Sequence, residues 1–233
     1  MRTADVTVGC VLKTGGEYIA DHVGALNYGL KKHSHGEAEL VCYTDVPDEV
    51  ESLGVRAVPL LRNRPGWWSV PEVFRETGKV VVVGLDTVFV RDIRPLLAVA
   101  RTTAPDQFWM IRNLGKGKGP ASGIMVWNGD WSWMFDEFNY QEVSKRLRGD
   151  ENYTIEALAE RDLKPSILQK SYHGDFHGGP MDDGTIVSYK QEVRGQFFPE
   201  DAIVVVFHGS PRPHEVHHAW RRANYPLKGE RGR

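Results

Sequence analysis

The segment KVVVVGLD (79–86) constrains the fold of this chain most, because its apolar residues do not alternate with polar ones. Four successive valines leave no position that suits water on either face of a strand. A strand of this kind belongs in the interior of a sheet covered by helices on both faces. The carboxylate that ends the segment, Asp86, is then either a turn cap or a functional group.

Strand and helix patterns alternate along the chain. Residues 5–12 indicate a strand, residues 20–33 carry apolar side chains at helical spacing, and residues 38–45 indicate a second buried strand. This βαβ unit predicts an α/β fold. Further strands are expected at 55–60, 79–86, 107–113, 123–128, 185–190 and 202–209, and helices at 69–76, 93–101 and 153–162.

The composition indicates one globular domain spanning residues 1–233. The chain is 41% hydrophobic and 26% charged, which suits a substantial core, and its formal net charge of -2 provides no global field that would recruit nucleic acid or an anionic membrane. The basic tail, 221–233, is expected to fray or to pack on the surface.

Cys10 and Cys42 each lie within an apolar run, which predicts buried, reduced thiols in a cytoplasmic protein. No window approaches the roughly 18 apolar residues that would span a bilayer. Five of the seven tryptophans occur in GWWSV and WNGDWSWMF. We expect these indoles to pack in the core, with stacking on a sugar as the alternative.

Polar residues follow several of the expected strands or begin them. They are Thr44, Asp45, Asp86, Ser122 and His208. Ligands of open α/β sheets bind beyond the carboxyl ends of the strands, so these side chains are candidates for a shared site. Asp86 and His208 offer a carboxylate oxygen and an imidazole nitrogen, a combination that suits Mn²⁺ better than Ca²⁺ and is compatible with Mg²⁺. The alternative is an ordinary cap or strand exit, above all for Asp45.

Six segments carry a resemblance to a known family. In chain order they are GWWSVPEVF, KVVVVGLDTVFVRDI, ASGIMVW, RGDENYTIEAL, IVSYK and IVVVFHGSPRPHEV. In this combination the chain resembles the glycosyltransferases related to glycogenin and the bacterial lipopolysaccharide galactosyl- and glucosyltransferases, in particular a bacterial and phage branch of small proteins. The resemblance covers nearly the whole chain. It implies a single-domain GT-A fold, which is a Rossmann-like nucleotide-diphospho-sugar transferase with a central mixed twisted sheet flanked by helices.

The resemblance also implies a metal site. Asp86 falls on the second aspartate of the family's Asp-x-Asp motif, and His208 matches its late histidine ligand. The implied cofactor is Mn²⁺ or Mg²⁺. Gly84 stands in place of the first aspartate, so this chain offers the metal one carboxylate fewer than the family motif does.

Further site residues follow from the same resemblance. Asp150 matches the acidic residue near the anomeric carbon, with Glu151 where glutamine is usual, and these two are the catalytic candidates. Val70 replaces a lysine of this branch. Residues implied to contact the donor are Cys10, Val11, Leu12, Thr44, Asp45, Asp86, Ser122, Gly123, Gly209 and Arg212.

The implied activity is transfer of a sugar from a nucleotide-diphosphate sugar, with UDP as the expected nucleotide, and with retention of anomeric configuration. The acceptor is a glycan, a lipid-linked glycan or modified DNA, in the cytoplasm of a bacterium or of a phage-infected host. One alternative is a phage transferase that acts on a hydroxymethylated base. Others are a nucleotide-sugar binding protein with impaired catalysis and, ranked third, a metal-dependent phosphohydrolase, which would need two metal positions.

Overall fold

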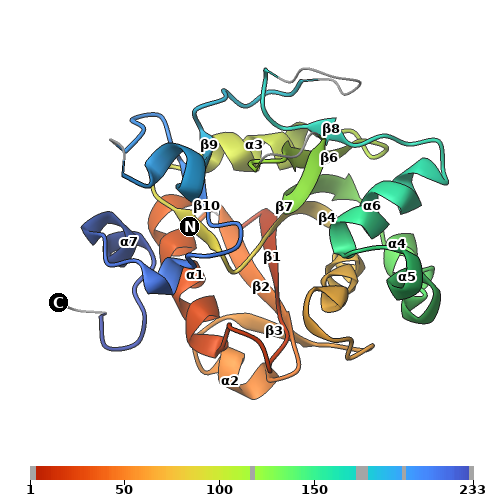
Figure 1. Ribbon diagram of the computed structural model, residues 1–233, viewed down its shortest axis with the longest axis horizontal. Coiled ribbons are helices and arrows are strands. Elements are labelled where there is room, and N and C mark those ends of the chain that lie inside the picture. The colour runs from red at the N-terminus through yellow and green to blue at the C-terminus, as the bar shows by residue number, and fades with distance from the viewer. Residues whose placement is uncertain (1–3, 116–118, 172–177, 196–197, 231–233) are drawn as a thin grey trace.

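The computed structural model describes residues 4–115, 119–171, 178–195 and 198–230. A seven-stranded mixed sheet forms its centre, with the strand order β3-β2-β1-β4-β7-β6-β8 (Figure 1). The strands are β1 (Val6–Leu12), β2 (Ala38–Thr44), β3 (Arg56–Pro59), β4 (Gly78–Val83), β6 (Phe108–Arg112), β7 (Pro120–Gly129) and β8 (Ser166–Ile167).

The order of the strands reverses between β1 and β4. β1 pairs in parallel with both β2 and β4, whereas β7 runs antiparallel between β4 and β6. The beginning of β7 therefore lies at the carboxyl end of β4, where Val83 pairs with Ile124 and the Gly84 N–H donates to the Gly123 carbonyl at 3.3 Å. This reversal is where open α/β sheets bind their ligands.

The large sheet separates two hydrophobic clusters, as the unbroken apolar run predicts. Val81 and Val83 of β4 belong to one cluster, and Val80 and Val82 belong to the other. α1 (Ala20–His33) and α3 (Arg94–Thr102) cover the first. η1 (Gly66–Arg75), α4 (Trp133–Asp136), α5 (Tyr140–Arg146) and α6 (Asp150–Ala159) cover the second. Figure 1 shows α1 and α7 on the opposite side of the sheet from α4, α5 and α6.

A second, three-stranded sheet has the order β5-β10-β9, with β5 (Thr87–Phe89), β9 (Ile186–Ser188) and β10 (Val204–Val206). β5 was not expected as a strand, because three residues are too few to show a period of their own. Its antiparallel pairing with β10 ends at a hydrogen bond from the Phe207 N–H to the Asp86 carbonyl, 2.9 Å long. The backbone of residue 86 is thereby fixed beside residues 207 and 208.

The described part of the C-terminal tail packs rather than frays. In α7 (Ala219–Asn224), Arg221 is 1% exposed and donates to the Val216 and Tyr225 carbonyls and to Glu230. The buried Tyr225 hydroxyl donates to the Leu85 carbonyl at 2.7 Å. The tail therefore supports the turn that carries Asp86.

Several sequence expectations are confirmed and others are refined. The helix at 20–33 has the bounds that its apolar spacing and terminal basic residues indicated. The expected helix at 69–76 is a 3-10 helix that contains Pro71, and the helix expected at 153–162 begins earlier, at Asp150. Both cysteines are buried and free. The remaining short elements are α2 (Pro47–Glu51), η2 (Tyr189–Val193) and η3 (Pro213–Glu215).

Within the described part of the chain, no helix combines the length and the hydropathy that crossing a bilayer requires.

Candidate functional site

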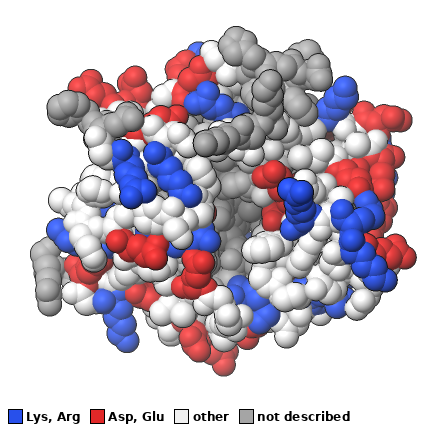
Figure 2. Space-filling view, viewed as in Figure 1, with Lys and Arg blue, Asp and Glu red and all other residues white. Residues whose placement is uncertain are grey.

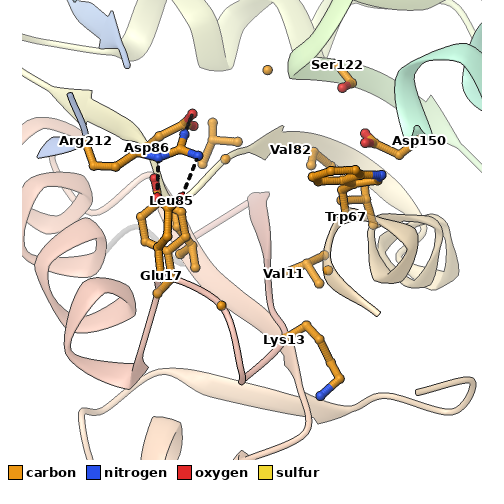
Figure 3. A pocket seen from close by; sticks show the side chains of 17 residues that line it. Val11, Lys13, Glu17, Trp67, Val82, Leu85, Asp86, Ser122, Asp150 and Arg212 are labelled. Carbon is orange, nitrogen blue, oxygen red and sulfur yellow. Dashed lines mark hydrogen bonds and ion pairs between the residues drawn. The ribbon is translucent and has the colours of Figure 1, made fainter. Parts of the chain in front are cut away.

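A pocket of about 460 Å³ opens at the carboxyl ends of β1 and β4, at the reversal of strand order (Figure 3). Residues from β1, the loop before α1, η1, the turn after β4, β7, α6 and the segment after β10 meet there. Its lining comprises Val11, Lys13, Gly16, Glu17, Tyr18, Gly66, Trp67, Val70, Val82, Val83, Gly84, Leu85, Asp86, Ser122, Gly123, Asp150 and Arg212.

Asp86 lies in the turn between β4 and β5. Its side chain is 21% exposed, and its ion-pair partner, the Arg212 guanidinium, stands 3.6 Å away, beyond hydrogen-bonding distance. Burial raises the pKa of Asp86 to about 6, although Arg212 acts in the opposite direction and Asp150 and Glu17 raise it further. A carboxyl held in this way is short of cationic partners.

Arg212 is held at the pocket by several contacts. Its Nε donates to Glu17 at 2.5 Å, and its backbone N–H donates to Glu215 at 2.6 Å. The next turn is tied to α1 by a 3.2 Å contact between His22 Nε2 and His214 Nδ1. The guanidinium therefore lies between two carboxylates, Glu17 and Asp86, as Figure 3 shows.

Asp150 and Ser122 lie on the other side of the pocket from Arg212 (Figure 3). Asp150 is the first residue of α6, and burial raises its pKa to about 6, partly offset by a hydrogen bond with the Ser122 side chain. Glu151 accepts a hydrogen bond from the Ser122 N–H at 3.4 Å, and burial raises its pKa as well. Asp150 is thus able to change charge near pH 6, and the same cause raises the pKa of its neighbour Glu151.

His208 lies one residue beyond the bond that links Phe207 to Asp86, but its imidazole points toward Ser188. His208 Nε2 and Ser188 Oγ are 2.6 Å apart. Burial and the nearby Lys190 lower the pKa of His208, which favours a neutral ring. Neither His208 nor Gly209 is among the described residues that line the pocket. A shared cation between Asp86 and His208 stays a prediction.

The candidate base and ribose end is built around β1. Val11 lines the pocket, whereas Cys10 and Leu12 are fully buried in the core. Asp45 accepts from Lys13 at 2.6 Å and from the Thr14 N–H at 3.0 Å, contacts that lower its pKa to about 2 against the effect of burial.

Neither Asp45 nor the buried Thr44, whose hydroxyl accepts from the Val46 N–H, is among the described residues that line the pocket. The structure thus makes Asp45 a support for the loop of Lys13.

The lining also contains side chains that the sequence did not single out, among them Glu17 and Tyr18, and it contains Trp67, for which sugar stacking was only the alternative. The strand-end rule points to the loop after β1, and hence to Glu17 and Tyr18, but it does not say which loop side chains turn inward. Burial raises the pKa of Tyr18. Trp67 is 61% exposed, contrary to the expectation of core packing, whereas Trp68, Trp127 and Trp131 are buried as expected.

The residues present fit a divalent cation only if the ligand completes its coordination. Within the described ranges, no three His, Cys, Asp or Glu side chains group so as to hold a metal. Asp86, however, has its ion-pair partner Arg212 only at 3.6 Å, beyond hydrogen-bonding distance, and the lining carries three acids (Glu17, Asp86 and Asp150) against two bases (Lys13 and Arg212). An anionic ligand at this site would need an added positive charge.

The described residues of the visible face carry mixed charges. Figure 2 shows lysine and arginine side chains interspersed with aspartate and glutamate rather than gathered into a basic stripe. A surface that binds a nucleic-acid backbone concentrates basic residues.

Comparison with known proteins identifies the fold. No protein-family model and no curated protein matches the chain. Among solved structures, the glycosyltransferase GlyE of Streptococcus pneumoniae TIGR4 superposes with a TM-score of 0.59 at 13% identity, over 91% of this chain and 56% of that one. The present chain therefore spans little more than half the length of GlyE.

Two further structures match over most of both chains. The galactosyltransferase LgtC, solved with donor and acceptor sugar analogues, has a TM-score of 0.54 at 8% identity and is covered over 88% of its length, by 89% of this chain. A glycosyltransferase involved in glycosylation of the major capsid of PBCV-1 has a TM-score of 0.51 at 11% identity, with 88% of this chain and 94% of that one covered. The fold is therefore the GT-A glycosyltransferase fold.

Proposed function

We propose that this protein is a glycosyltransferase that moves a sugar from a nucleotide-diphosphate sugar to an acceptor hydroxyl. The observation that carries the proposal is the pocket at the β1/β4 reversal of a GT-A fold. Arg212 and Asp86 lie at one side of this pocket, and Asp150, whose pKa burial raises to about 6, lies at the other, with Glu151 next to it in the chain. This polarity matches a donor whose leaving group is anionic and whose sugar becomes cationic.

Arg212 binds the diphosphate in this proposal. The guanidinium is already oriented by Glu17 and stands 3.6 Å from Asp86, so it can donate to phosphate oxygens without leaving the pocket. Val11 and Lys13 hold the nucleoside, with UDP as the proposed nucleotide, and Asp45 keeps Lys13 in place. Ser122 and Gly123, at the start of β7, contact the donor sugar.

A divalent cation, Mn²⁺ or Mg²⁺, would neutralise charge on the departing diphosphate. Asp86 would supply its carboxylate, and His208 would supply its imidazole after turning from Ser188. Because Gly84 offers no second carboxylate, the rest of the coordination shell would come from the diphosphate and water.

Asp150 steadies the positive charge that develops at the anomeric carbon or orients the acceptor hydroxyl, with Glu151 beside it. Retention of anomeric configuration is part of the proposal and is supported by the sequence resemblance described above. It is checked by the anomeric proton coupling of the first-formed product.

The experiment is a nucleotide-sugar panel measured by calorimetry with and without Mn²⁺, followed by product analysis. One nucleotide sugar should bind in the presence of Mn²⁺ and be transferred or slowly hydrolysed. Asp86→Ala and His208→Ala should weaken its binding. Asp48→Ala and His217→Ala, which alter exposed residues outside the pocket lining, should not.

Two outcomes would redirect the proposal. Donor binding without transfer or hydrolysis would favour an impaired binding protein, the alternative that Gly84 motivates. No binding of any nucleotide sugar would contradict the proposed function.

A further inference from the structure

Trp67 and Trp68 are adjacent in the sequence but have opposite environments. Trp68 is 9% exposed and packs beside Phe138 and Tyr140, with ring centroids 6.2 and 6.0 Å away. Trp67 is 61% exposed although it lines the pocket. A large aromatic ring left in water at the mouth of a pocket is typical of a surface that a ligand covers.

The position of Trp67 relates it to the reacting end of the pocket. A Cβ built on Gly149 would lie 3.5 Å from Cδ1 and Nε1 of the indole, so the ring edge rests against the residue that precedes Asp150. Figure 3 shows Trp67 and Asp150 together, across the pocket from Arg212. The indole thus borders the place where the acceptor must approach the donor sugar.

We infer that Trp67 is a stacking platform for the acceptor and that the acceptor is therefore a carbohydrate ring. The inference rests on the proposed function. In that proposal the diphosphate binds at Arg212 and the donor sugar between Arg212 and Asp150, so the next ring outward would be that of the acceptor. Trp67 is the exposed aromatic residue of the described lining at that position.

The chemistry of the platform favours a sugar. One face of a pyranose carries C–H groups that pack on an aromatic ring, while its hydroxyls at the edge stay in water or reach polar groups. A base flipped from DNA would also stack on an indole, but its phosphates would approach a pocket lined by Glu17, Asp86 and Asp150. The carbohydrate is the occupant that the charges favour.

The test uses simple glycosides, since the natural acceptor has not been identified. Methyl glucosides, galactosides and mannosides of both anomeric forms are offered to the protein loaded with UDP and Mn²⁺. Saturation-transfer NMR reports binding, and transfer from the active donor reports KM. We expect at least one glycoside to bind to the parent protein through its C–H face. The same glycoside should show no such binding to Trp67→Ala.

Matched variants separate stacking from general disruption. Trp67→Ala should raise the KM for the glycoside about ten-fold or more, and Trp67→Phe should restore most of the affinity. Leu61→Ala removes another exposed apolar side chain, outside the pocket lining, and should change neither the KM nor the affinity for the glycoside. Because Trp67 is exposed, both of its variants should keep the melting temperature of the parent.

UDP binding distinguishes the failure of this inference from the failure of the proposed function. If the parent protein does not bind UDP with Mn²⁺, the proposed function itself fails. If the parent binds UDP but Trp67→Ala loses it, the indole belongs to the donor site and the inference is wrong. Three other results would overturn the inference. The first is an unchanged KM for the glycoside in Trp67→Ala, and the second is that the parent binds no glycoside. The third is transfer to an oligonucleotide with hydroxymethylated bases that depends on Trp67.

Discussion

At the scale of single residues, two carboxyls of the pocket have raised pKa values, and their ionisation lowers the stability of the fold. Burial raises the pKa values of Asp86 and Asp150 to about 6. The folded chain therefore binds these protons more tightly than the unfolded chain does. Each ionisation consequently destabilises the fold as pH rises from about 4 to about 6.

Replacing Asp150 by asparagine should remove one of these costs. We expect Asp150→Asn to stabilise the protein by ~1–3 kcal/mol at pH 8, with a smaller effect at pH 5, while sugar transfer is lost. Thermal melts of the variant and its parent at the two pH values provide the measurement. Asp130→Asn serves as the control, because the pKa of that exposed carboxyl is lowered by hydrogen bonds to Ser132. A variant less stable than its parent at pH 8 would show that the charge of Asp150 is better compensated than its raised pKa implies.

Gly84 allows a direct test of how Asp86 binds a cation. A Cβ at residue 84 would lie 2.3 Å from Asp86 Oδ1, so any side chain there must displace that carboxylate. Gly84→Ala should therefore weaken Mn²⁺ binding measured calorimetrically with UDP present. Gly84→Asp displaces Asp86 in the same way but adds a second carboxylate, so it should bind Mn²⁺ about ten-fold more tightly than Gly84→Ala does. Equal effects of the two substitutions would argue against a cation at Asp86.

At the same scale, the sequence located some of the site residues but not others. Asp86, Ser122 and Asp150 line one pocket because strand ends and a helix start have positions that topology sets. Glu17 and Trp67 could not be placed, since the direction of a loop side chain depends on tertiary packing. The roles of all these residues stay predictions.

At the scale of elements, long periodic segments were predictable and short ones were not. The helix at 20–33 has apolar residues at helical spacing throughout, whereas β5 exists because Thr87 to Phe89 pair with β10. The 3-10 geometry of η1 accompanies a proline inside the helix, Pro71, which cannot donate its backbone nitrogen. Tertiary pairing, rather than local pattern, decides such elements.

The C-terminal segment is expected to stabilise the turn of Asp86 through Tyr225. Tyr225→Phe removes the donor to the Leu85 carbonyl and should destabilise the protein by roughly 1–2 kcal/mol, because that carbonyl is left unpaired beside the turn of Asp86. Urea denaturation measures the change. Tyr28→Phe, at a tyrosine 44% exposed on α1, should have almost no effect. Equal stabilities of the two variants would mean that the tail contributes little to the turn.

At the scale of the whole molecule, the charges lead to a prediction about DNA as an acceptor. A net charge of -2 and interspersed surface charges predict no measurable binding to duplex DNA at physiological salt. Fluorescence anisotropy with a labelled duplex tests this. Tight binding that weakens steeply with added salt would restore the phage DNA-modifying alternative.

The central claim is that a nucleotide diphosphate and a cation meet beside Asp86 in the β1/β4 pocket. Anomalous diffraction at the manganese edge, from crystals grown with UDP and Mn²⁺, tests it directly. The account predicts a peak about 2.0–2.6 Å from a carboxylate oxygen of Asp86, with the diphosphate between it and Arg212. A nucleotide bound elsewhere, or a manganese peak away from Asp86, would contradict it.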